Sequence, residues 1–545
     1  MRDSIEMESA GGQTDDARLL VLGYRGTLRP MQREMLPPAM EALLEPWLAQ
    51  AGHRLNQRVP QEHRVFQGEL VPLESLLPLL QDRLIGILTQ ALGAIGIDPN
   101  DPPASDIYRD FPLLPSLIRG VVSEWVAAIS TFLQRLHRDQ SWLAASLQCP
   151  QMPPIGSISA TASDMHAGGH SVLCVCFQGG GCLYYKPHPL TGEWLWHELL
   201  EAIAGVDPQL HLPAPRVFTR DANSRYGWVE SVFLEENWLS HTADARPPEA
   251  IDYWHIAGAL LCLAQHVHLT DLHLGNIVAT AFGPAVTDAE CFATPILHPA
   301  LSENSSKQTD ALFDGLDAIL STGLLPRKNI SSLPDVSGLF GHSAPVSAIR
   351  LPAWSLSSDG RYQLSSVGAE LVDHGNAPTE TTPIAVLPRM LSGYRHAAEL
   401  LIGARKTLLA PGSQWRAVLE KLHAPRLVLR NTLTYGWLLS QSLEPQSLRS
   451  CYQRRNVILA ELQSGSRTNL PAAVVRAELS AILQLHVPRL TILPGSRSLA
   501  TGSGRAMARR FTASTPAQSV LESIETLSSE SIDTLHVPAL LTAIL

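Results

Sequence analysis

Apolar residues recur at intervals of three and four along much of the N-terminal quarter of the chain. Ser75–Ile97 and Ser116–Leu147 show this spacing, which places apolar side chains on one face of a helix. We expect these stretches to form a packed helical layer without chemistry of its own, within an N-terminal helical part over residues 18–150. The acidic and polar residues 1–17 predict a flexible tail.

The pattern then changes to short apolar runs. Ser171–Phe177 and Cys182–Lys186 are β-like runs separated by Gln-Gly-Gly-Gly, which predicts a hairpin. A helix over Glu193–Ala204 and a strand over Val229–Leu234 follow. Residues 151–240 are therefore expected to form a small β-rich lobe.

Residues 241–297 begin with an apolar helical pattern over Pro248–His268. Ile277–Ala279 and Ala285–Thr287 follow as short strands around a Phe-Gly-Pro turn. Residues 298–388 are rich in Ser, Pro, Gly and Asp, which predicts a loop-rich segment. Such a segment is either a lid over an active site or a surface insertion.

Helical spacing returns over residues 389–545, which predicts a C-terminal helical lobe. A β-rich lobe that precedes a helical lobe suits a kinase-like fold, in which the small lobe covers the nucleotide. The expected fold class is α+β, with a two-lobe core and additional helical parts at both ends.

Composition restricts the classes of function. The chain has 545 residues, of which 45% are hydrophobic and 17% charged, as is typical of a globular protein with a core. Its net charge of −10 argues against non-specific nucleic-acid binding. No apolar run reaches the roughly 20 residues that span a bilayer, and the N-terminus lacks the apolar core of a signal peptide. We therefore predict a cytoplasmic protein without a transmembrane segment.

The seven cysteines are scattered and odd in number, so we expect reduced thiols rather than a disulfide framework. Cys174 and Cys176 form a C-x-C pair on the first hairpin strand. A metal pair is one interpretation, but buried small side chains are the favoured one. The sequence contains no C-x-x-C and no Cys-His pair, so it predicts no zinc site.

One stretch, LTDLHLGNIVATAFGPAVTDAECF, concentrates candidate catalytic residues. Asp271 is followed five residues later by Asn276, which is the spacing of the kinase catalytic loop. Asp288 and Glu290 are two residues apart, so a strand would place both carboxylates on one face. Phosphoryl transfer needs an orienting carboxylate and oxygen ligands for a metal, and Mg²⁺ prefers such ligands. The stretch therefore predicts a phosphotransferase site that uses ATP and Mg²⁺.

Other segments offer groups for the same chemistry. Lys186 ends the second hairpin strand, where it can reach nucleotide phosphates. Asp164 and His166 precede the hairpin in SDMHAGGHSV, whose Gly-Gly pair lets backbone N–H groups approach a phosphate or simply forms a turn. Arg426 and Arg430 lie four residues apart, which suits either a bound phosphate or ordinary ion pairs on a helix.

Together, these motifs resemble the dehydratase domain of class II lanthipeptide synthetases, the LanM type. From about residue 110 onward, the matching blocks are FPLLPSLIR, RLHRDQSWL, DMHAGGHSV, YYKPHPL, YGWVE, TDLHLGNIVA, TDAE, RLVLRNTLTY and LHVPRLTILPGSRSL. The resemblance implies a lipid-kinase-like core that phosphorylates Ser and Thr of a ribosomal precursor peptide with ATP and Mg²⁺. It further implies elimination of the phosphate, which leaves dehydroalanine or dehydrobutyrine.

The resemblance also implies a role for each matching residue. Lys186 would contact the ATP phosphates. Asp271 would position or deprotonate the substrate hydroxyl, with His273 in the same site. Mg²⁺ would be held by three side chains with oxygen atoms, Asn276, Asp288 and Glu290. A further group would act mainly in elimination: Asp164, His166, Arg426 and Thr432.

The chain departs from the family pattern in three places. It has no Cys-His pair and ends where the zinc-binding cyclase domain would begin, so ring closure is expected from a separate partner or not at all. Leu274-Gly275 stands where the family commonly has Phe-Glu, which removes one carboxylate near the site. Activity is still expected, because the phosphate and metal residues remain. The part before residue 110 is shorter than in relatives, which leaves binding of the leader peptide open.

Two other functions stay open at this point. A small-molecule kinase of the aminoglycoside-phosphotransferase type also has D-L-H-x-x-N followed by D-x-E, but it lacks the surrounding blocks. A catalytically inactive scaffold that binds the precursor peptide would fit the missing cyclase and Gly275. The scaffold fits less well with a complete set of phosphate and metal residues.

Overall fold

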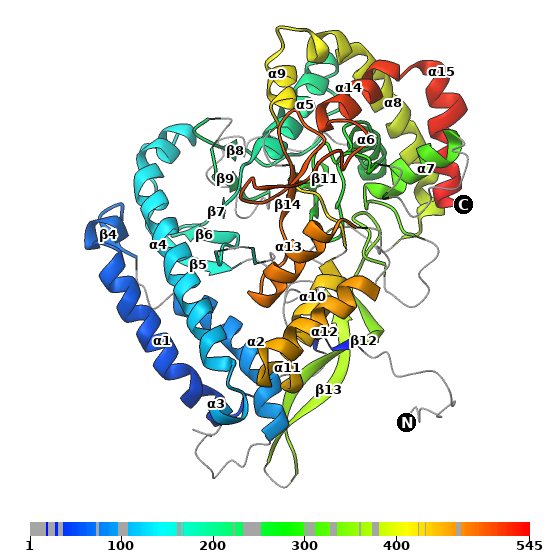
Figure 1. Cartoon of the computed structure of the whole chain (residues 1–545). Helices are drawn as coiled ribbons and strands as arrows, with labels where there is room; N and C mark the ends of the chain where they lie inside the picture. Colours follow the sequence, from blue (N-terminus) through cyan, green and yellow to red (C-terminus); the bar gives the residue numbers. More distant parts are fainter. Residues whose placement is uncertain are drawn as a thin grey trace, which may run out of the picture.

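The computed structural model of the chain mixes helices with small sheets, which confirms the expected α+β class (Figure 1). The predicted tail over residues 1–17 and the candidate Asp164 lie outside the described residues. The structure describes residues 18–19, 28–30, 36–71, 76–95, 107–160, 165–166, 168–221, 224–232, 252–298, 301, 311–327, 335–358, 361–372, 376, 381–422, 425–430, 432–464 and 470–545.

The N-terminal part is helical, as predicted. Its helices are α1 (Pro38–Arg58), α2 (Leu77–Ile95), α3 (Ile107–Asp110) and α4 (Leu114–Ser146). Between α1 and α2 lie η1 (Gln61–Arg64), β3 (Val65–Phe66) and β4 (Glu69–Leu70). The helices α2 and α4 begin and end within two residues of the amphipathic stretches in the sequence, so the apolar spacing located them correctly.

By length and composition alone, α4 is able to cross a membrane. However, 56% of its most apolar window is buried inside this chain. It packs against α1 and α2, and its Phe132 contacts Tyr185 of the neighbouring sheet. Because a core helix passes the same test, α4 is weak evidence for a membrane span.

An antiparallel sheet follows, with the strand order β5-β6-β7-β9-β8. Its strands are β5 (Ile155–Ala160), β6 (Leu173–Phe177), β7 (Cys182–Lys186), β8 (Val217–Phe218) and β9 (Gly227–Glu230). The hairpin β6–β7 confirms the prediction from the glycine run. Gly179, Gly180 and Gly181 all have positive φ, which only glycine adopts without strain.

The side chains of this hairpin alternate between two faces. Leu173, Val175 and Leu183 belong to the core that the sheet shares with α4. Cys174 and Tyr184 line the cleft on the other side, as does Lys186 at the end of β7. The alternation therefore places Lys186 on the cleft face.

Asp139 ties α4 to the sheet. Its carboxylate is only 1% exposed and accepts hydrogen bonds from Tyr226 Oη at 2.7 Å and Trp228 Nε1 at 3.0 Å. Arg220 Nε donates to the same carboxylate at 2.8 Å. A buried carboxylate is tolerated when several donors replace its water, so these bonds make the helical part and the sheet one packed unit.

The helical lobe is built on α6 (Tyr253–His266) and α8 (Pro383–Leu409), whose backbones touch. A Cβ on Gly258 would lie 2.0 Å from the backbone oxygen of Met390, and one on Gly393 would lie 1.7 Å from that of His255. Only glycine permits this approach. The helices α5 (Thr191–Val206) and α9 (Gln414–Glu420) pack on the same core. Residues 248–251 of the predicted helix lie outside the described residues.

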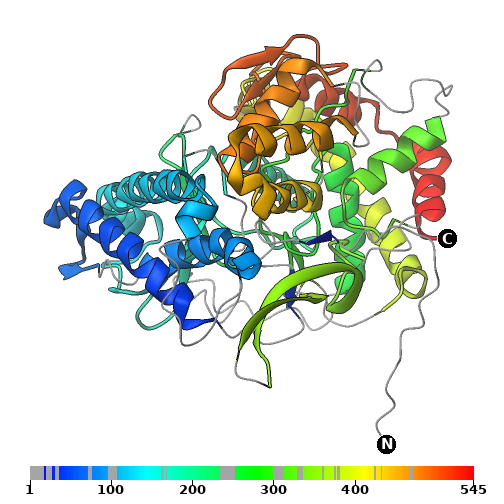
Figure 2. The same cartoon turned by 60° about the horizontal axis from the view of Figure 1, so that its bottom comes forward.

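The prediction of a loop-rich segment over residues 298–388 is wrong for much of its described part. This part contains α7 (Ala311–Ser321) and a long hairpin of β12 (Ala344–Leu356) and β13 (Tyr362–Leu371). The strands β1 (Arg18–Leu19) and β2 (Leu28–Pro30) pair with its two edges. Figure 2 brings this hairpin to the front.

The same segment supports the loop that follows α6. Leu274 packs against Val346, Ile349 and Leu351 of β12. The backbone nitrogen of Leu274 also donates to the backbone oxygen of Val336 at 2.9 Å. These contacts place residues 335–371 beneath the Asp271 loop, so the described part acts as a brace for that loop.

The C-terminal part combines helices with a small antiparallel sheet, β14-β15-β16. Its helices are α10 (Thr432–Gln441), α11 (Pro445–Arg449), α12 (Cys451–Ser464), α13 (Ala472–Leu483), α14 (Pro516–Thr526), α15 (Ser529–Ser531), η5 (Ile532–His536) and α16 (Val537–Ile544). The strands are β14 (Leu490–Ile492), β15 (Leu499–Thr501) and β16 (Ala506–Ala508). The segment between α13 and β14 reaches the cleft.

Candidate active site

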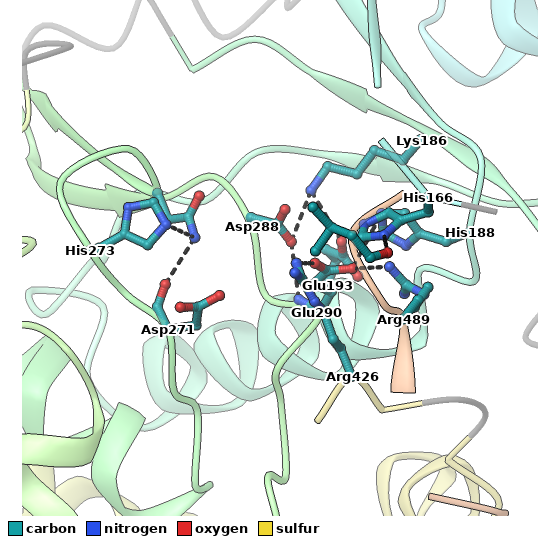
Figure 3. A network of polar contacts seen from close by, with 12 residues as sticks. His166, Lys186, His188, Glu193, Asp271, His273, Asp288, Glu290, Arg426 and Arg489 are labelled. Atoms are coloured by element: carbon teal, nitrogen blue, oxygen red, sulfur yellow. Dashed lines mark hydrogen bonds and ion pairs between the residues drawn. The ribbon is translucent and has the colours of Figure 1, made fainter. Parts of the chain in front are cut away.

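The loop Asp271–Asn276 connects α6 to β10 (Ile277–Thr280) and carries the first candidate residues (Figure 3). Asp271 has a φ of 65°, a left-handed conformation that is costly for a residue other than glycine. Asn276 Nδ2 donates to the backbone oxygen of Asp271 at 2.8 Å and lies 3.4 Å from His273 Nε2. Since the amide nitrogen is used in this way, the amide oxygen of Asn276 is the atom that can bind a cation.

Lys186 bridges the sheet and this loop region. Its Nζ donates to Glu193 Oε1 and to the backbone oxygen of Thr287, both at 3.1 Å, and lies 3.3 Å from Asp288 Oδ1. Burial alone would lower the pKa of Lys186, but neighbouring carboxylates, Asp288 first, outweigh burial and raise it. The ammonium therefore stays charged. We call the following group the loop end of the site: Lys186, Asp271, Asn276 and Asp288.

Glu193 lies in the first turn of α5 and is 4% exposed. Burial raises the pKa of Glu193 to about 7, against the opposing charge of Lys186. Its second oxygen, Oε2, is buried and has no hydrogen-bond partner among the described residues. A Lys–Glu pair between a strand and a helix also occurs in the active state of protein kinases, where the lysine serves the nucleotide.

Glu290 lies between two arginines. Arg489 Nη1 donates to Glu290 Oε2 at 2.5 Å, and Arg426 Nη1 donates to Oε1. Burial opposes ionisation, but Arg489 and Arg426 outweigh it and hold the pKa of Glu290 well below its usual range. The strand expected to carry Asp288 and Glu290 ends earlier, because β11 is Gly283–Val286. The two acids lie in the turn that follows, where Glu290 N donates to Asp288 Oδ1 at 3.1 Å.

Two histidines lie next to these arginines, the half-buried His166 and the buried His188. His166 Nδ1 is 3.1 Å from the backbone oxygen of Val487. Because a carbonyl oxygen only accepts, Nδ1 carries the proton and Nε2 keeps its lone pair. Burial, then the two arginines, lowers the pKa of His166 well below its usual range. Burial likewise lowers the pKa of His188 to about 4. We call this group the arginine end: His166, His188, Glu290, Arg426 and Arg489.

The segment His486–Arg489 fixes the arginine end. Val487 N donates to the backbone oxygen of Met165 at 2.9 Å, next to the bond between Val487 and His166. His486 Nε2 lies 2.8 Å from Glu124 Oε2 on α4. One short segment therefore connects the N-terminal helices to both a histidine and an arginine of the site.

Both ends open into one cleft of about 1970 Å³. Its walls come from the β5–β9 sheet, the Asp271 loop, α13 and the β14–β16 sheet. Burial raises the pKa of Asp271, although His273 and Arg426 oppose this effect. Small-molecule pockets typically measure about 300–1,000 Å³, so this cleft is larger than a single small molecule requires.

The structure brings most of the predicted residues together in this cleft. They are His166, Lys186, Asp271, His273, Asn276, Asp288, Glu290 and Arg426. All of these except Asn276 are labelled in Figure 3. Arg430 also borders the cleft, but its guanidinium forms a buried ion pair with Glu478, at 3.0 Å, and donates to the backbone oxygen of Leu462. Thr432 is the first residue of α10, but its side chain is not among the described ones.

Sequence analysis missed three charged or titratable residues of the site. Glu193 had a signal, since it opens the helix that follows Lys186. His188 lies two residues after Lys186 in a quoted block, and Arg489 lies in another, but neither has a local pattern that indicates a role. Arg489 and Glu290 are 199 residues apart in the sequence, so no local motif could predict their contact.

The expected reduced state of the thiols is wrong for one pair. Cys176 and Cys182 face each other across β6 and β7 and form a disulfide. The sequence interpretation considered Cys174 and Cys176 alone, because cross-strand neighbours are not adjacent in the chain.

The family model of DUF4135, a domain of unknown function, matches residues 111–492, and the chain belongs to this family. The chain is also similar to the lacticin 481/lactococcin biosynthesis protein LcnDR2 of Lactococcus lactis subsp. lactis. The two are 22% identical over 402 residues, which cover 70% of this chain and 41% of that relative. The chain thus spans less than half of that protein's length. These matches confirm the resemblance to LanM-type lanthipeptide synthetases.

Proposed function

We propose that this chain is a LanM-like dehydratase in lanthipeptide biosynthesis. It would phosphorylate Ser and Thr of a ribosomal precursor peptide with ATP, and then eliminate the phosphate. The observation that carries this proposal is that the loop end and the arginine end line the same cleft. Asp288 of the loop end and Glu290 of the arginine end are only two residues apart in the sequence. The DUF4135 family and the lacticin relative support the same pathway class.

A lipid-kinase-like two-lobe core is part of this proposal. The β5–β9 sheet with Lys186 corresponds to the lobe above the nucleotide, and the helices around α6 correspond to the lobe below it. The Lys186–Glu193 pair supports this arrangement, because it joins a strand to the next helix as in kinases.

In the phosphorylation step, Asp271 would accept the proton of the substrate hydroxyl, and Lys186 would contact the phosphates. The raised pKa of Asp271 suits a proton acceptor. His273 supports Asn276 within the same loop. Bound Mg²⁺ would neutralise phosphate charge.

Asn276 and Asp288 fit a magnesium site. The amide nitrogen of Asn276 is used by the Asp271 loop, which leaves its oxygen for the cation. Both oxygens of Glu290, the third expected ligand, already accept hydrogen bonds from arginines. We therefore assign Glu290 to the orientation of Arg426 and Arg489.

In the elimination step, His166 Nε2 would take the Cα proton of the phosphorylated residue. The C–H electron pair forms the Cα=Cβ bond, the Cβ–O bond breaks, and the phosphate leaves with its electrons beside Arg426 and Arg489. The neutral state of His166 supports a base, and two arginines support an anionic leaving group. The family resemblance adds Asp164 and Thr432 to this step.

The test is mass spectrometry of a candidate precursor peptide after incubation with the full chain, ATP and Mg²⁺. We expect the loss of one water for each modified Ser or Thr. A product that keeps the added phosphoryl group would restrict the activity to phosphorylation. Phosphorylation of an aminoglycoside in place of the peptide would favour the small-molecule kinase, and no binding of ATP–Mg²⁺ would favour the scaffold.

A further inference from the structure

We propose that Cys174, Cys176 and Cys182 form a reversible thiol–disulfide centre on the cleft face of the β6–β7 hairpin. Cys176 and Cys182 are cross-strand partners and are joined by a disulfide. Cys174 lies two residues before Cys176 on the same face, and its Sγ is 3.6 Å from that of Cys176. All three sulfur atoms lie within 4.8 Å of one another.

The burial of the three side chains gives them different roles. Cys174 and Cys176 are half-buried, whereas Cys182 is buried. Cys174 also lines the cleft, so a small solute thiol or disulfide reaches the centre from there. Cys262 and Cys291 are buried elsewhere, and burial raises the pKa of both thiols, which makes them poor nucleophiles.

The oxidant is a small-molecule disulfide of the glutathione class. The Cys176 thiolate attacks one sulfur of that disulfide, which forms a mixed disulfide and releases one thiolate. The Cys182 thiolate then attacks Cys176 Sγ, which closes the internal disulfide and releases the second thiolate. Two protein thiols are oxidised and one small disulfide is reduced to two thiols, with the protein protons passing to solvent. An excess of the small thiol reverses both steps.

Cys174 accelerates the exchange. Its thiolate attacks Cys176 Sγ at 3.6 Å, which moves the disulfide bond to Cys174 and Cys176 and releases the Cys182 thiolate. No net oxidation occurs in this step. It transfers the bond toward the cleft, where a small thiol then attacks it.

The consequence for the cleft rests on the proposed function. The disulfide closes residues 177–181, whose glycines form the hairpin turn, and β7 continues from Cys182 to Lys186. Oxidation therefore stiffens the hairpin that carries the phosphate-binding lysine. We expect the oxidised and reduced chains to bind nucleotide with different affinities.

The first experiment uses the full chain with Cys149→Ser and Cys451→Ser, which removes the two thiols outside this centre that are not fully buried. The protein is equilibrated in buffers of varied glutathione ratio, alkylated, and mapped by mass spectrometry. We expect Cys176 and Cys182 to become protected together, reversibly, as the ratio becomes oxidising. A pair that stays oxidised, or stays reduced, at every ratio overturns the proposal.

Cys174→Ser tests the exchange role in the same background. We expect the same pair to form at the same ratio, but to be reduced several-fold more slowly. An unchanged reduction rate overturns the role of Cys174. The thermal unfolding midpoint of this variant, compared with its parent, checks that the fold is kept.

The second experiment titrates a fluorescent ATP analogue with Mg²⁺ into the oxidised and reduced chains. We expect a several-fold difference in Kd, which disappears in the Cys176→Ser/Cys182→Ser variant. Equal affinity in both states overturns the link to the cleft. If the glutathione titration succeeds but neither state binds the nucleotide, the proposed function fails while the thiol–disulfide centre stands.

Discussion

The two ends of the cleft are built in opposite ways. The loop end has two carboxylates, an amide and one lysine, and most of these groups come from one stretch of eighteen residues, Asp271 to Asp288. The arginine end has two arginines around a single carboxylate, and its five residues come from five separate segments. Oxygen-rich groups bind a cation, and arginines bind an anion. In the proposed function, a metal-bound nucleotide would occupy the loop end and the departing phosphate the arginine end.

The largest expected effect comes from the loop end. Asp271→Asn keeps the size of the side chain but removes the proton acceptor, so phosphorylation should fall by about 10²–10⁴-fold. Phosphopeptide and dehydrated peptide are both measured by mass spectrometry. Elimination from a chemically prepared phosphopeptide should be affected far less. Full turnover by the variant would remove Asp271 from the catalytic role.

The next effect comes from the carboxylate at the arginine end. Glu290→Gln leaves Arg426 and Arg489 without their counter-charge in a buried site, which should cost about 3–5 kcal/mol of unfolding free energy. Urea unfolding measures this loss. In the folded fraction, phosphopeptide should accumulate, because the arginines lose their orientation.

Arg430→Lys is the matched control, since Arg430 is also buried against a glutamate but its ion pair lies with Glu478. That variant should lose stability without accumulating phosphopeptide. Accumulation in both variants would mean that general destabilisation explains the effect.

A pH dependence should distinguish Glu193 from the histidines. Glu193 has a pKa of about 7 in the folded chain against an ordinary value of 4.5. The folded state therefore binds this proton more tightly than the unfolded state does. The free energy of unfolding is highest below pH 4.5 and falls as the pH rises from 4.5 to about 7. The expected loss is roughly 1–3 kcal/mol. His166 acts in the opposite direction, because burial lowers its pKa in the folded chain and the unfolded chain takes up the proton first, so this group makes stability fall as pH falls below about 6.5.

Denaturant unfolding at several pH values between 4.5 and about 7 measures how the free energy of unfolding changes with pH. Glu193→Gln should remove the fall in stability toward high pH, because glutamine does not titrate, whereas His166→Gln should remove an opposing contribution and make that fall steeper. A slope that survives in the glutamine variant of Glu193 would assign the titration to another group.

The smallest effect is expected at Gly275. A Cβ there would lie 3.0 Å from Cε1 of the His273 ring, so the ring must move by a few tenths of an ångström. Gly275→Ala should cost about 1 kcal/mol in stability or in the phosphorylation barrier. Steady-state kinetics of peptide phosphorylation measures the second quantity. Loss as large as that of Asp271→Asn would show that the loop tolerates no side chain at this position.

The sequence predicted the loop end better than the arginine end for a physical reason. Asp271, Asn276 and Asp288 lie in one local motif, so the short chain between them is enough to keep their side chains close together. Arg489 joins Glu290 only after the C-terminal part has packed on the core. Glu193 could have been predicted from the sequence, because a buried lysine on a strand needs a counter-charge and the next helix has an acid in its first turn.

Sequence analysis also missed the hairpin of β12 and β13, and the prolines of β12 explain why. The strand β12 contains Pro345 and Pro352, which lowered its strand propensity in the sequence. In the structure, β1 pairs only with Ile349 and Arg350 of β12, so neither proline has to donate on that side. The alternation of β13 and the Asp-Gly before it were the available signals.

The carboxylate of Asp139 limits how far the protein can be trimmed. A fragment that starts after α4 would keep the whole DLHLGN motif but would lose this acceptor and expose to water the apolar sheet face that packs on α4. Each Å² of apolar surface left in water costs about 25 cal/mol. A fragment that folds on its own must therefore retain α4, although the proposed catalytic residues all lie after it.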